Sequence, residues 1–136
     1  VVNEDRKKIS SRVAMEQCVQ TSTTFASWVE KAKKDFVLMK EALKEADFEK
    51  IGEITESNAL AMHETTTTSS PSFTFLTEES HRAMDIVKQL RSQGYKCYFT
   101  MDAGPNVKVL YLKEDQDKLY KEISKLWNKK IILCME

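Results

Sequence analysis

The sequence is poor in the residues on which many small binding motifs depend. It has only three glycines, so it contains no glycine-rich phosphate-binding loop. Its three cysteines lie far apart, at positions 18, 97 and 134, and make neither a disulfide framework nor a CxxC metal-binding motif. No signal peptide opens the chain, and no apolar run approaches the roughly 18–20 residues of a membrane span. These absences argue against a P-loop nucleotide binder, a disulfide scaffold and a membrane span.

The sequence also lacks an excess of charge of either sign. Lys and Arg together number 21, as do Asp and Glu, so the formal net charge is zero. General nucleic-acid binders and polybasic membrane-surface proteins both need an excess of cations, so neither class is predicted. Few, widely spaced cysteines are typical of proteins that work in the reducing cytoplasm.

What the sequence has is the composition of an ordinary globular domain. Apolar residues make up 41% of the 136 residues and charged residues 31%, which suffices for one hydrophobic core. The chain does not start with Met but opens on Val1-Val2, as if a strand had been cut from a longer protein. We therefore expect residues 1–136 to be a single domain taken from a longer protein.

Apolar residues spaced three and four apart predict five helices. They are expected at about 10–20, 25–46, 47–63, 77–93 and 114–127, with Ser10 or Ser11 capping the first, Asp47 the third, and Gly94 ending the fourth. A polar run from Thr65 to Pro71 predicts a surface loop. The second helix is expected to bury a stripe made of Phe25, Trp28, Val29, Ala32, Phe36, Met39, Leu43 and Ala46.

After Gly94 the apolar period changes from 3.6 to 2, which predicts strands at 95–102 and 107–112. Their connection is too short for a crossover, so they should pair as an antiparallel hairpin. Residues 1–9 are expected to open with the end of a strand, and 131–134 to form a last strand. The predicted fold is α+β, a ferredoxin-like two-layer sandwich with an antiparallel sheet of about four strands and helices on one face.

The start of the first predicted helix has the groups that bind an anion. Ser10 and Ser11 bring hydroxyls, Arg12 a guanidinium, and the helix start brings free backbone N–H groups, while Lys7 and Lys8 precede them. Such groups suit phosphate oxygens. The residues alone nevertheless favour a capped helix with solvated bases.

The hairpin connection is the second candidate. It runs from Asp102 to Asn106, longer than the two residues that a minimal hairpin needs, and would present a carboxylate and backbone N–H groups beyond the sheet. The alternative is simple hairpin closure. His63 and His81 show no ligand spacing with each other or with a cysteine, so no metal site is predicted.

Longer segments resemble a known family. Residues 58–66, 71–80 and 98–108 look like the C-terminal half of bacterial members of the diphosphomevalonate decarboxylase family, and residues 7–15 are similar to the segment ahead of its long helices. The string Phe-Thr-Met-Asp-Ala-Gly-Pro-Asn-Val at 99–107 is specific for it among galactokinase, homoserine kinase, mevalonate kinase and phosphomevalonate kinase relatives. The resemblance covers nearly the whole chain.

The resemblance implies a cytoplasmic enzyme of the mevalonate route to isoprenoids. Such an enzyme uses ATP and Mg²⁺ to phosphorylate the C3 hydroxyl of mevalonate 5-diphosphate, and loss of phosphate and CO₂ gives isopentenyl diphosphate. It further implies that Asp102 lies beside that hydroxyl, as its base or to orient it, and that the backbone of Ala103 and Gly104 lines the substrate. Ser11 and Arg12 are then expected to contact the diphosphate and Met15 to line the same pocket, which favours the phosphate site over the capped helix.

In this family the ATP-binding loop and the Arg for the substrate carboxylate belong to an N-terminal domain. Since neither is found here, ATP and Mg²⁺ are expected to bind mainly to that domain, the chain to fold but be inactive alone, and the full enzyme to be a homodimer. The sequence departs from the family at Ser10, where Pro is common, at Val13-Ala14, where Tyr-Gly is common, and at 65–70, where Gly and a second Pro often occur.

Two alternatives remain open from the sequence. One is the equivalent domain of a sister kinase of the same superfamily, although such kinases usually carry glycine-rich sequence at the hairpin. The other is a free-standing ferredoxin-like binding module, which would tolerate replacement of Asp102 without functional loss.

Overall fold

The computed structural model of the chain describes residues 1–2 and 10–134 and divides the chain into two compact units. One unit is residues 6–75, and the other joins residues 1–5 to 76–136. In the described residues, every helix is too short or too polar to cross a bilayer.

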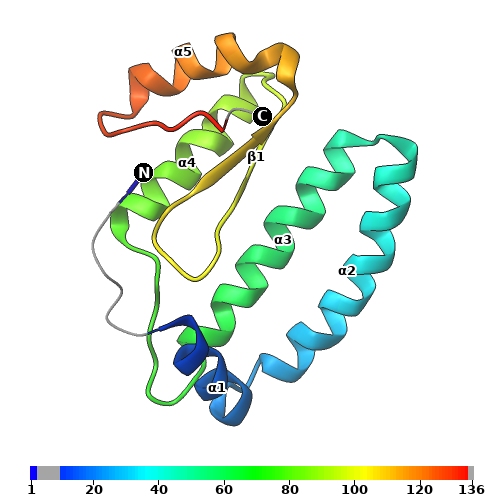
Figure 1. The fold of residues 1–136 in the computed structure, drawn as a ribbon, viewed down its shortest axis with the longest axis vertical. Coiled ribbons are helices and arrows are strands. Elements are labelled where there is room, and N and C mark those ends of the chain that lie inside the picture. The colour runs from blue at the N-terminus through cyan, green and yellow to red at the C-terminus, as the bar shows by residue number, and fades with distance from the viewer. Residues whose placement is uncertain (3–9, 135–136) are drawn as a thin grey trace. The chain divides into compact units, whose positions relative to one another are not determined.

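The unit of residues 6–75 is helical. It contains α1 (Ser11–Thr21), α2 (Phe25–Glu45) and α3 (Phe48–Thr67), and α2 and α3 pack side by side as an antiparallel pair (Figure 1). The tight turn between them is made by Ala46, which has a left-handed backbone (φ 54°), and by Asp47, whose Oδ1 accepts from the Lys50 N–H at 3.1 Å. Asp47 therefore caps α3, as the sequence predicts.

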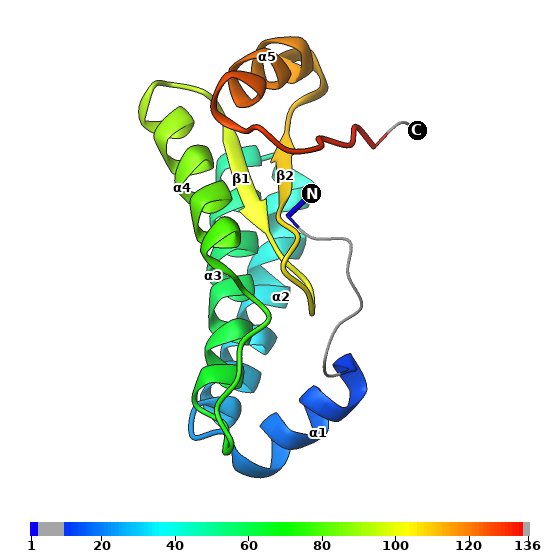
Figure 2. The same ribbon diagram turned by 90° about the vertical axis from the view of Figure 1, so that its left-hand side faces the viewer.

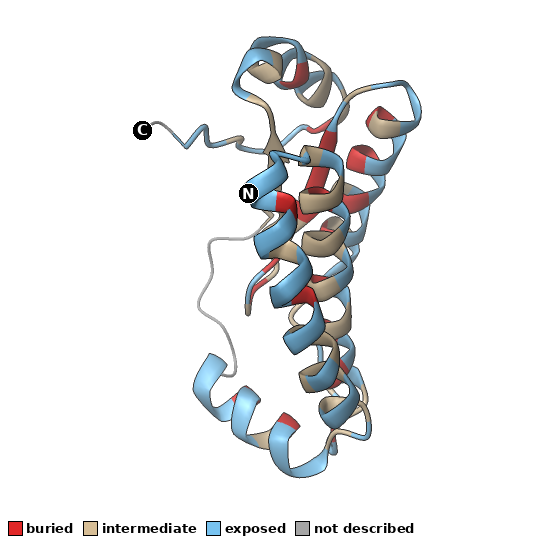
Figure 3. Ribbon diagram, turned by 90° about the vertical axis from the view of Figure 1, so that its right-hand side faces the viewer, coloured by how far each residue is buried: buried red, intermediate tan, exposed pale blue. Residues whose placement is uncertain are grey.

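The buried face of α2 differs from the expected stripe. Most of α2 is exposed or intermediate in burial (Figure 3). Phe36 is 64% exposed and Leu43 60%, whereas Asp35 is buried and accepts bonds from Lys31 Nζ at 2.7 Å and Asn58 Nδ2 at 2.9 Å. Small residues are prominent among the other buried positions of the pair, which include Ala42 on α2 and Gly52 and Ala59 on α3. A contact made by small residues is narrow, so it leaves the large apolar side chains on its flanks exposed.

The threonine run is another correction, because the predicted loop begins as helix. Residues 65–67 form the last turn of α3, and Thr65 and Thr66 are buried. Each hydroxyl donates to a carbonyl three residues earlier, from Thr65 to Met62 at 2.6 Å and from Thr66 to His63 at 2.7 Å. Threonines that bond their own helix in this way can be buried without losing a hydrogen bond. The predicted loop therefore starts at Thr65, whereas helix α3 continues to Thr67.

The second unit is an α+β arrangement, which confirms the fold class. Its elements are α4 (Glu78–Ser92), β1 (Cys97–Thr100), β2 (Lys108–Tyr111), the short 3₁₀ helix η1 (Lys113–Asp115) and α5 (Gln116–Leu126). Gly94, with φ of 97°, ends α4 as predicted. Helix α4 covers one face of β1, and β1 and β2 form the predicted antiparallel hairpin (Figure 2). The core of this unit contains Met84, Val87, Leu90, Cys97, Phe99, Met101 and Leu119.

The sheet is smaller than predicted in the part of the chain that the structure describes. It has two strands there, in register from Cys97 opposite Tyr111 to Thr100 opposite Lys108. The expected strand at 131–134 is not confirmed, because these residues have no regular secondary structure and no sheet pairing. Most of the strand expected within 1–9 lies outside the described residues. The ends of the unit do meet, since the Val1 amino group donates to the Lys130 carbonyl at 2.7 Å.

Candidate functional site

Asp102 stands where the hairpin leaves the sheet. Strand β1 ends at Thr100, Met101 is buried, and the Asp102 side chain then points outward with 70% of its surface exposed. Its Oδ2 accepts a bond from Lys108 Nζ at 2.8 Å, and Lys108 is itself 60% exposed. An exposed ion pair of this kind contributes about 0–1 kcal/mol, so Lys108 does not lock the carboxylate away from an incoming group.

The two residues after Asp102 turn the chain back toward the core. Gly104 N–H donates to the Asp102 carbonyl at 2.7 Å, Ala103 is half-buried and Gly104 is buried. The structure thus brings the predicted residues Asp102, Ala103 and Gly104 together, with one exposed carboxylate followed by a tight backbone turn.

The loop is held in place by residues that are distant in sequence. Ser80 Oγ, on the first turn of α4, donates to the Pro105 carbonyl at 2.6 Å, and the Val2 N–H donates to Asn106 Oδ1 at 2.7 Å. Ser80 is completely buried. The sequence reasoning did not identify Ser80 as a loop anchor. The available signal was its spacing from Thr77, a capping box in which each residue bonds the other's backbone.

The predicted anion site lies at the start of α1, in the other unit. Ser10, not Ser11, is the N-cap, since its Oγ accepts from the Val13 N–H at 3.3 Å. Ser11 and Arg12 follow as the first two helical residues, and both are exposed. No ion pair to Arg12 exists among the described residues. Arg12 is thus an exposed cation in the first turn of a helix, and a helix start leaves backbone N–H groups for a ligand.

Met15 lies on the same face of α1 as Arg12. It is 64% exposed, and together with Arg12 and Val19 it lines a shallow pocket along the helix. An exposed methionine beside a cation can contact the apolar part of a charged ligand while the cation meets its charge. The structure thus groups the predicted residues Ser11, Arg12 and Met15 on one helix.

The remaining polar features do not form a second site. In the described part of the chain, no three His, Cys, Asp or Glu side chains gather to hold a metal ion. His63 is buried in α3, where the sequence favoured a surface or helix-end position, and His81 is exposed on α4. Neither takes part in a group of three metal-ligating side chains in the described part of the chain.

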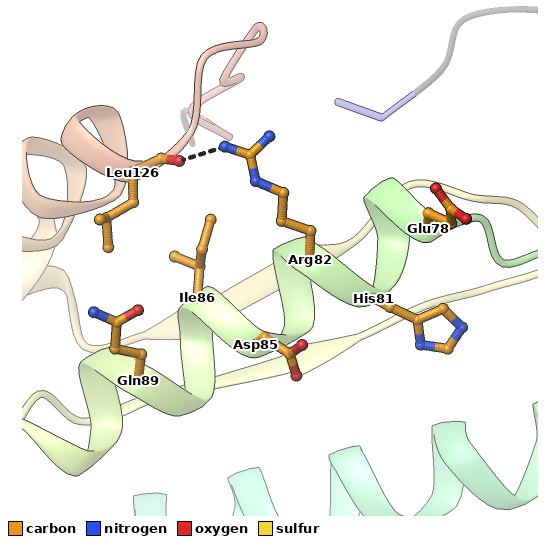
Figure 4. Close-up of a pocket in the computed structure, with 7 residues that line it drawn as sticks. All are labelled: Glu78, His81, Arg82, Asp85, Ile86, Gln89 and Leu126. Carbon is orange, nitrogen blue, oxygen red and sulfur yellow. Dashed lines mark hydrogen bonds between the residues drawn. The ribbon is translucent and has the colours of Figure 1, made fainter.

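The second unit also has a pocket along α4, at the end of α5 (Figure 4). Arg82 crosses it, because its Nη2 donates to the Leu126 carbonyl at 3.3 Å. None of the predicted site residues lines this pocket, so it is separate from the Asp102 loop. Its lining residues are Glu78, His81, Arg82, Asp85, Ile86, Gln89 and Leu126.

Comparison with known proteins gives one family throughout. Residues 1–133 match the sequence model of the mevalonate 5-diphosphate decarboxylase C-terminal domain. The structure of mevalonate pyrophosphate decarboxylase from Streptococcus pyogenes is similar, with a TM-score of 0.92 and 53% identity over 97% of this chain. A structure of MDDEF in complex with MVAPP, AMPPCP and magnesium gives a TM-score of 0.89 and 43% identity over 94% of this chain. The diphosphomevalonate decarboxylase of Candida albicans is 32% identical over 88% of the chain.

The match covers only a part of each relative. The chain spans 41% of the Streptococcus protein, 39% of the MDDEF chain and 33% of the Candida protein. Neither a sister kinase nor an unrelated ferredoxin-like module explains a match that runs over residues 1–133. The chain belongs to the C-terminal domain family of mevalonate 5-diphosphate decarboxylases.

Proposed function

We propose that the chain is the C-terminal part of an ATP-dependent mevalonate 5-diphosphate decarboxylase. The full enzyme would phosphorylate the C3 hydroxyl of the substrate and then eliminate phosphate and CO₂ to give isopentenyl diphosphate. The observation that carries this proposal is the exposed Asp102 carboxylate at the start of the hairpin loop. The loop is held in place by two hydrogen bonds, from Ser80 to Pro105 and from Val2 to Asn106. The family match supplies the reaction, and the geometry supplies a group able to act in it.

In this proposal the Asp102 carboxylate accepts a hydrogen bond from the C3 hydroxyl of the substrate. This bond orients the hydroxyl oxygen toward the γ-phosphate of ATP. Phosphoryl transfer depends mainly on positioning and on neutralising charge, and one carboxylate within hydrogen-bond reach of the attacking oxygen meets the first need. The same carboxylate can take the hydroxyl proton as the new P–O bond forms and the bond between the γ-phosphorus and the β-phosphate oxygen of ATP breaks, which would release ADP. The backbone at Ala103 and Gly104 would line the substrate beside it.

We also propose that Ser11 and Arg12 bind the substrate diphosphate and that Met15 lines its pocket. The support is the exposed guanidinium at a helix start and the apolar surface next to it. A guanidinium can hold phosphate oxygens through two parallel hydrogen bonds, which a lysine cannot do.

Arg12→Ala in the full-length enzyme should then raise KM for mevalonate 5-diphosphate by roughly 10- to 100-fold, because a bond to a charged group contributes about 1.5–3 kcal/mol. The turnover number should change less, since the diphosphate binds equally in the ground and transition states. Steady-state kinetics measure both. Lys44→Ala, which removes another exposed cation of the same unit, should leave KM unchanged. An unchanged KM in Arg12→Ala would remove Arg12 from the diphosphate site.

ATP and Mg²⁺ are the cofactors of the proposed reaction. The MDDEF structure contains AMPPCP, an ATP analogue, and magnesium. In the described residues of this chain, no three carboxylate, imidazole or thiol groups gather into a metal site of their own. We propose, as the family resemblance implies, that the N-terminal domain holds both groups and that Mg²⁺ there would neutralise the phosphate charge during transfer.

The proposal extends to the assembly of the enzyme. In the full enzyme, residues 1–136 would form one C-terminal domain whose sheet has the ferredoxin-like four strands, because a two-stranded hairpin is marginally stable by itself. The hydrogen bond from the Val1 amino group to the Lys130 carbonyl supports this proposal, since it joins the start of segment 1–9 to the residue that precedes segment 131–134. The full enzyme would be a homodimer. The three free thiols of residues 1–136 suit the reducing cytoplasm.

An assay of released CO₂ and phosphate tests the proposed function. The full-length protein should convert mevalonate 5-diphosphate only when ATP and Mg²⁺ are both present. Residues 1–136 alone should release neither product, because the proposed nucleotide site lies elsewhere. Release by the isolated chain would contradict the division between domains, and phosphorylation of another small alcohol without CO₂ would indicate a sister kinase.

A further inference from the structure

The hydroxyl of Ser80 links two parts of the second unit that lie far apart in the sequence. Its oxygen is 2.6 Å from the Pro105 carbonyl oxygen, 25 residues away. A carbonyl only accepts, so Ser80 must be the donor. Proline has no N–H group, and this carbonyl is therefore the one backbone polar group that can fix Pro105.

The other side of the same hydroxyl is also occupied. Ser80 Oγ accepts from the Thr77 N–H at 3.1 Å, while Thr77 Oγ1 accepts from the Ser80 N–H at 3.3 Å. The bond from the Thr77 backbone N–H, which a substitution of the Thr77 side chain leaves in place, thus orients the Ser80 hydroxyl toward Pro105. With none of its surface exposed, Ser80 cannot exchange this bond for one to solvent.

The hydrogen bond at Pro105 restrains the backbone of Asp102 because the two residues are close in the sequence. Pro105 follows Asp102 by three residues, and the Gly104 N–H closes the turn between them on the Asp102 carbonyl at 2.7 Å. The Asp102 side chain is itself exposed, with an exposed lysine as its ion-pair partner. Its orientation therefore depends on the backbone more than on side-chain packing.

We infer that Ser80 is a positioning residue for the Asp102 carboxylate, because its hydrogen bond to Pro105 holds the loop that carries Asp102. This inference rests on the proposed function of Asp102 as far as activity is concerned. The hold on the loop does not depend on that function and can be measured separately.

The test compares Ser80→Ala with Thr77→Ala in the full-length enzyme. Thr77→Ala removes the helix cap but leaves the hydroxyl that reaches Pro105, so it controls for a weakened α4. Ser80→Ala should lower kcat by roughly 10- to 100-fold with little change in KM, because a misplacement of about 1 Å can cost about 100-fold. Thr77→Ala should keep kcat within about threefold of the wild type.

Amide hydrogen exchange on the substrate-free protein gives a readout independent of activity. Peptides that cover residues 102–107 should exchange at least about tenfold faster in Ser80→Ala and at the wild-type rate in Thr77→Ala, since exchange follows local opening. Ser80→Cys adds a variant that keeps nearly the same volume but donates weakly. It guards against a failure of Ser80→Ala to fold, and its kcat should fall between the other two.

Three results would overturn the inference. They are an equal kcat in Ser80→Ala and Thr77→Ala, unchanged exchange at 102–107 in Ser80→Ala, and wild-type kcat in Ser80→Cys together with an unfolded Ser80→Ala. If the wild-type enzyme released no CO₂ but Ser80→Ala alone loosened the loop, the proposed function would fail while the hold of Ser80 on the loop would stand.

Discussion

Replacing Asp102 by Asn in the full-length enzyme should lower kcat for decarboxylation by about 10²–10⁴-fold, the usual contribution of a proton-accepting group. Asn keeps an oxygen that can accept a hydrogen bond but loses the charge and the ability to take the proton. KM for mevalonate 5-diphosphate should stay near the wild-type value, because Arg12 and Ser11 are proposed to hold the diphosphate. Steady-state measurement of CO₂ release at saturating ATP separates the two constants.

Asp85→Asn provides the matched control. Asp85 is also exposed and also pairs with a lysine, Lys88, at 3.4 Å, but it lines the pocket along α4 and not the loop (Figure 4). Its replacement should leave kcat within about threefold of the wild type. Full activity of Asp102→Asn would remove Asp102 from the chemistry, and a large loss in Asp85→Asn would point to the α4 pocket.

Asp102→Asn should not lower kcat by destabilising the fold. The side chain is 70% exposed, and its ion pair with Lys108 is between two exposed groups. Exposed substitutions of this kind change the free energy of unfolding by about 0.5 kcal/mol or less. A fall in kcat without a fall in melting temperature would therefore belong to the reaction.

The candidate loop was predictable because its signal is local. Alternating apolar residues end at Met101, Gly104 and Pro105 make a turn, and the antiparallel pairing of Thr100 with Lys108 brings the strands together as expected. These patterns require only neighbours in the sequence. The role of Asp102 came from resemblance, since the residues alone also allowed ordinary hairpin closure.

The hold on the loop was not predictable in the same way. The bond between Ser80 and Pro105 joins residues 25 apart, and no periodic pattern encodes a contact between a helix start and a hairpin turn. The sequence did show Thr77 at the start of α4, and its spacing from Ser80 is that of a capping box. The complete burial of Ser80 could not be predicted from the sequence, because it depends on how α4 packs in the folded unit.

Helix α2 shows why a face can be misjudged even when the helix itself is right. Its residues repeat at period 3.6, which the sequence identifies, but Phe36 and Leu43 lie exposed while Asp35 and Ala42 face α3. Hydrophobicity alone favours the large side chains for burial. The partner helix decides otherwise here, because Asn58 on α3 donates to the Asp35 carboxylate at 2.9 Å and so holds that polar side chain at the buried face.

Phe99→Ala should be among the most damaging core substitutions, lowering the free energy of unfolding of the 136-residue chain by about 3–5 kcal/mol. Phe99 has no exposed surface, lies opposite Val109 in the hairpin, and belongs to the same core as Val87 and Leu90 of α4. Removing the ring leaves a cavity between sheet and helix that the unit cannot readily fill. Such a loss is a large share of the roughly 5–15 kcal/mol that stabilises a small domain.

Phe36→Ala makes the same chemical change on the exposed face of α2 and tests the burial directly. With 64% of its surface exposed, Phe36 should contribute less than about 1 kcal/mol, because little apolar area is removed from water. Urea denaturation followed by circular dichroism measures both variants, and equal slopes would show that only stability has changed. A loss of about 3 kcal/mol or more in Phe36→Ala would restore the apolar stripe predicted from the sequence. A small loss in Phe99→Ala would contradict the packing of β1 on α4, and with it the base on which the Asp102 loop is built.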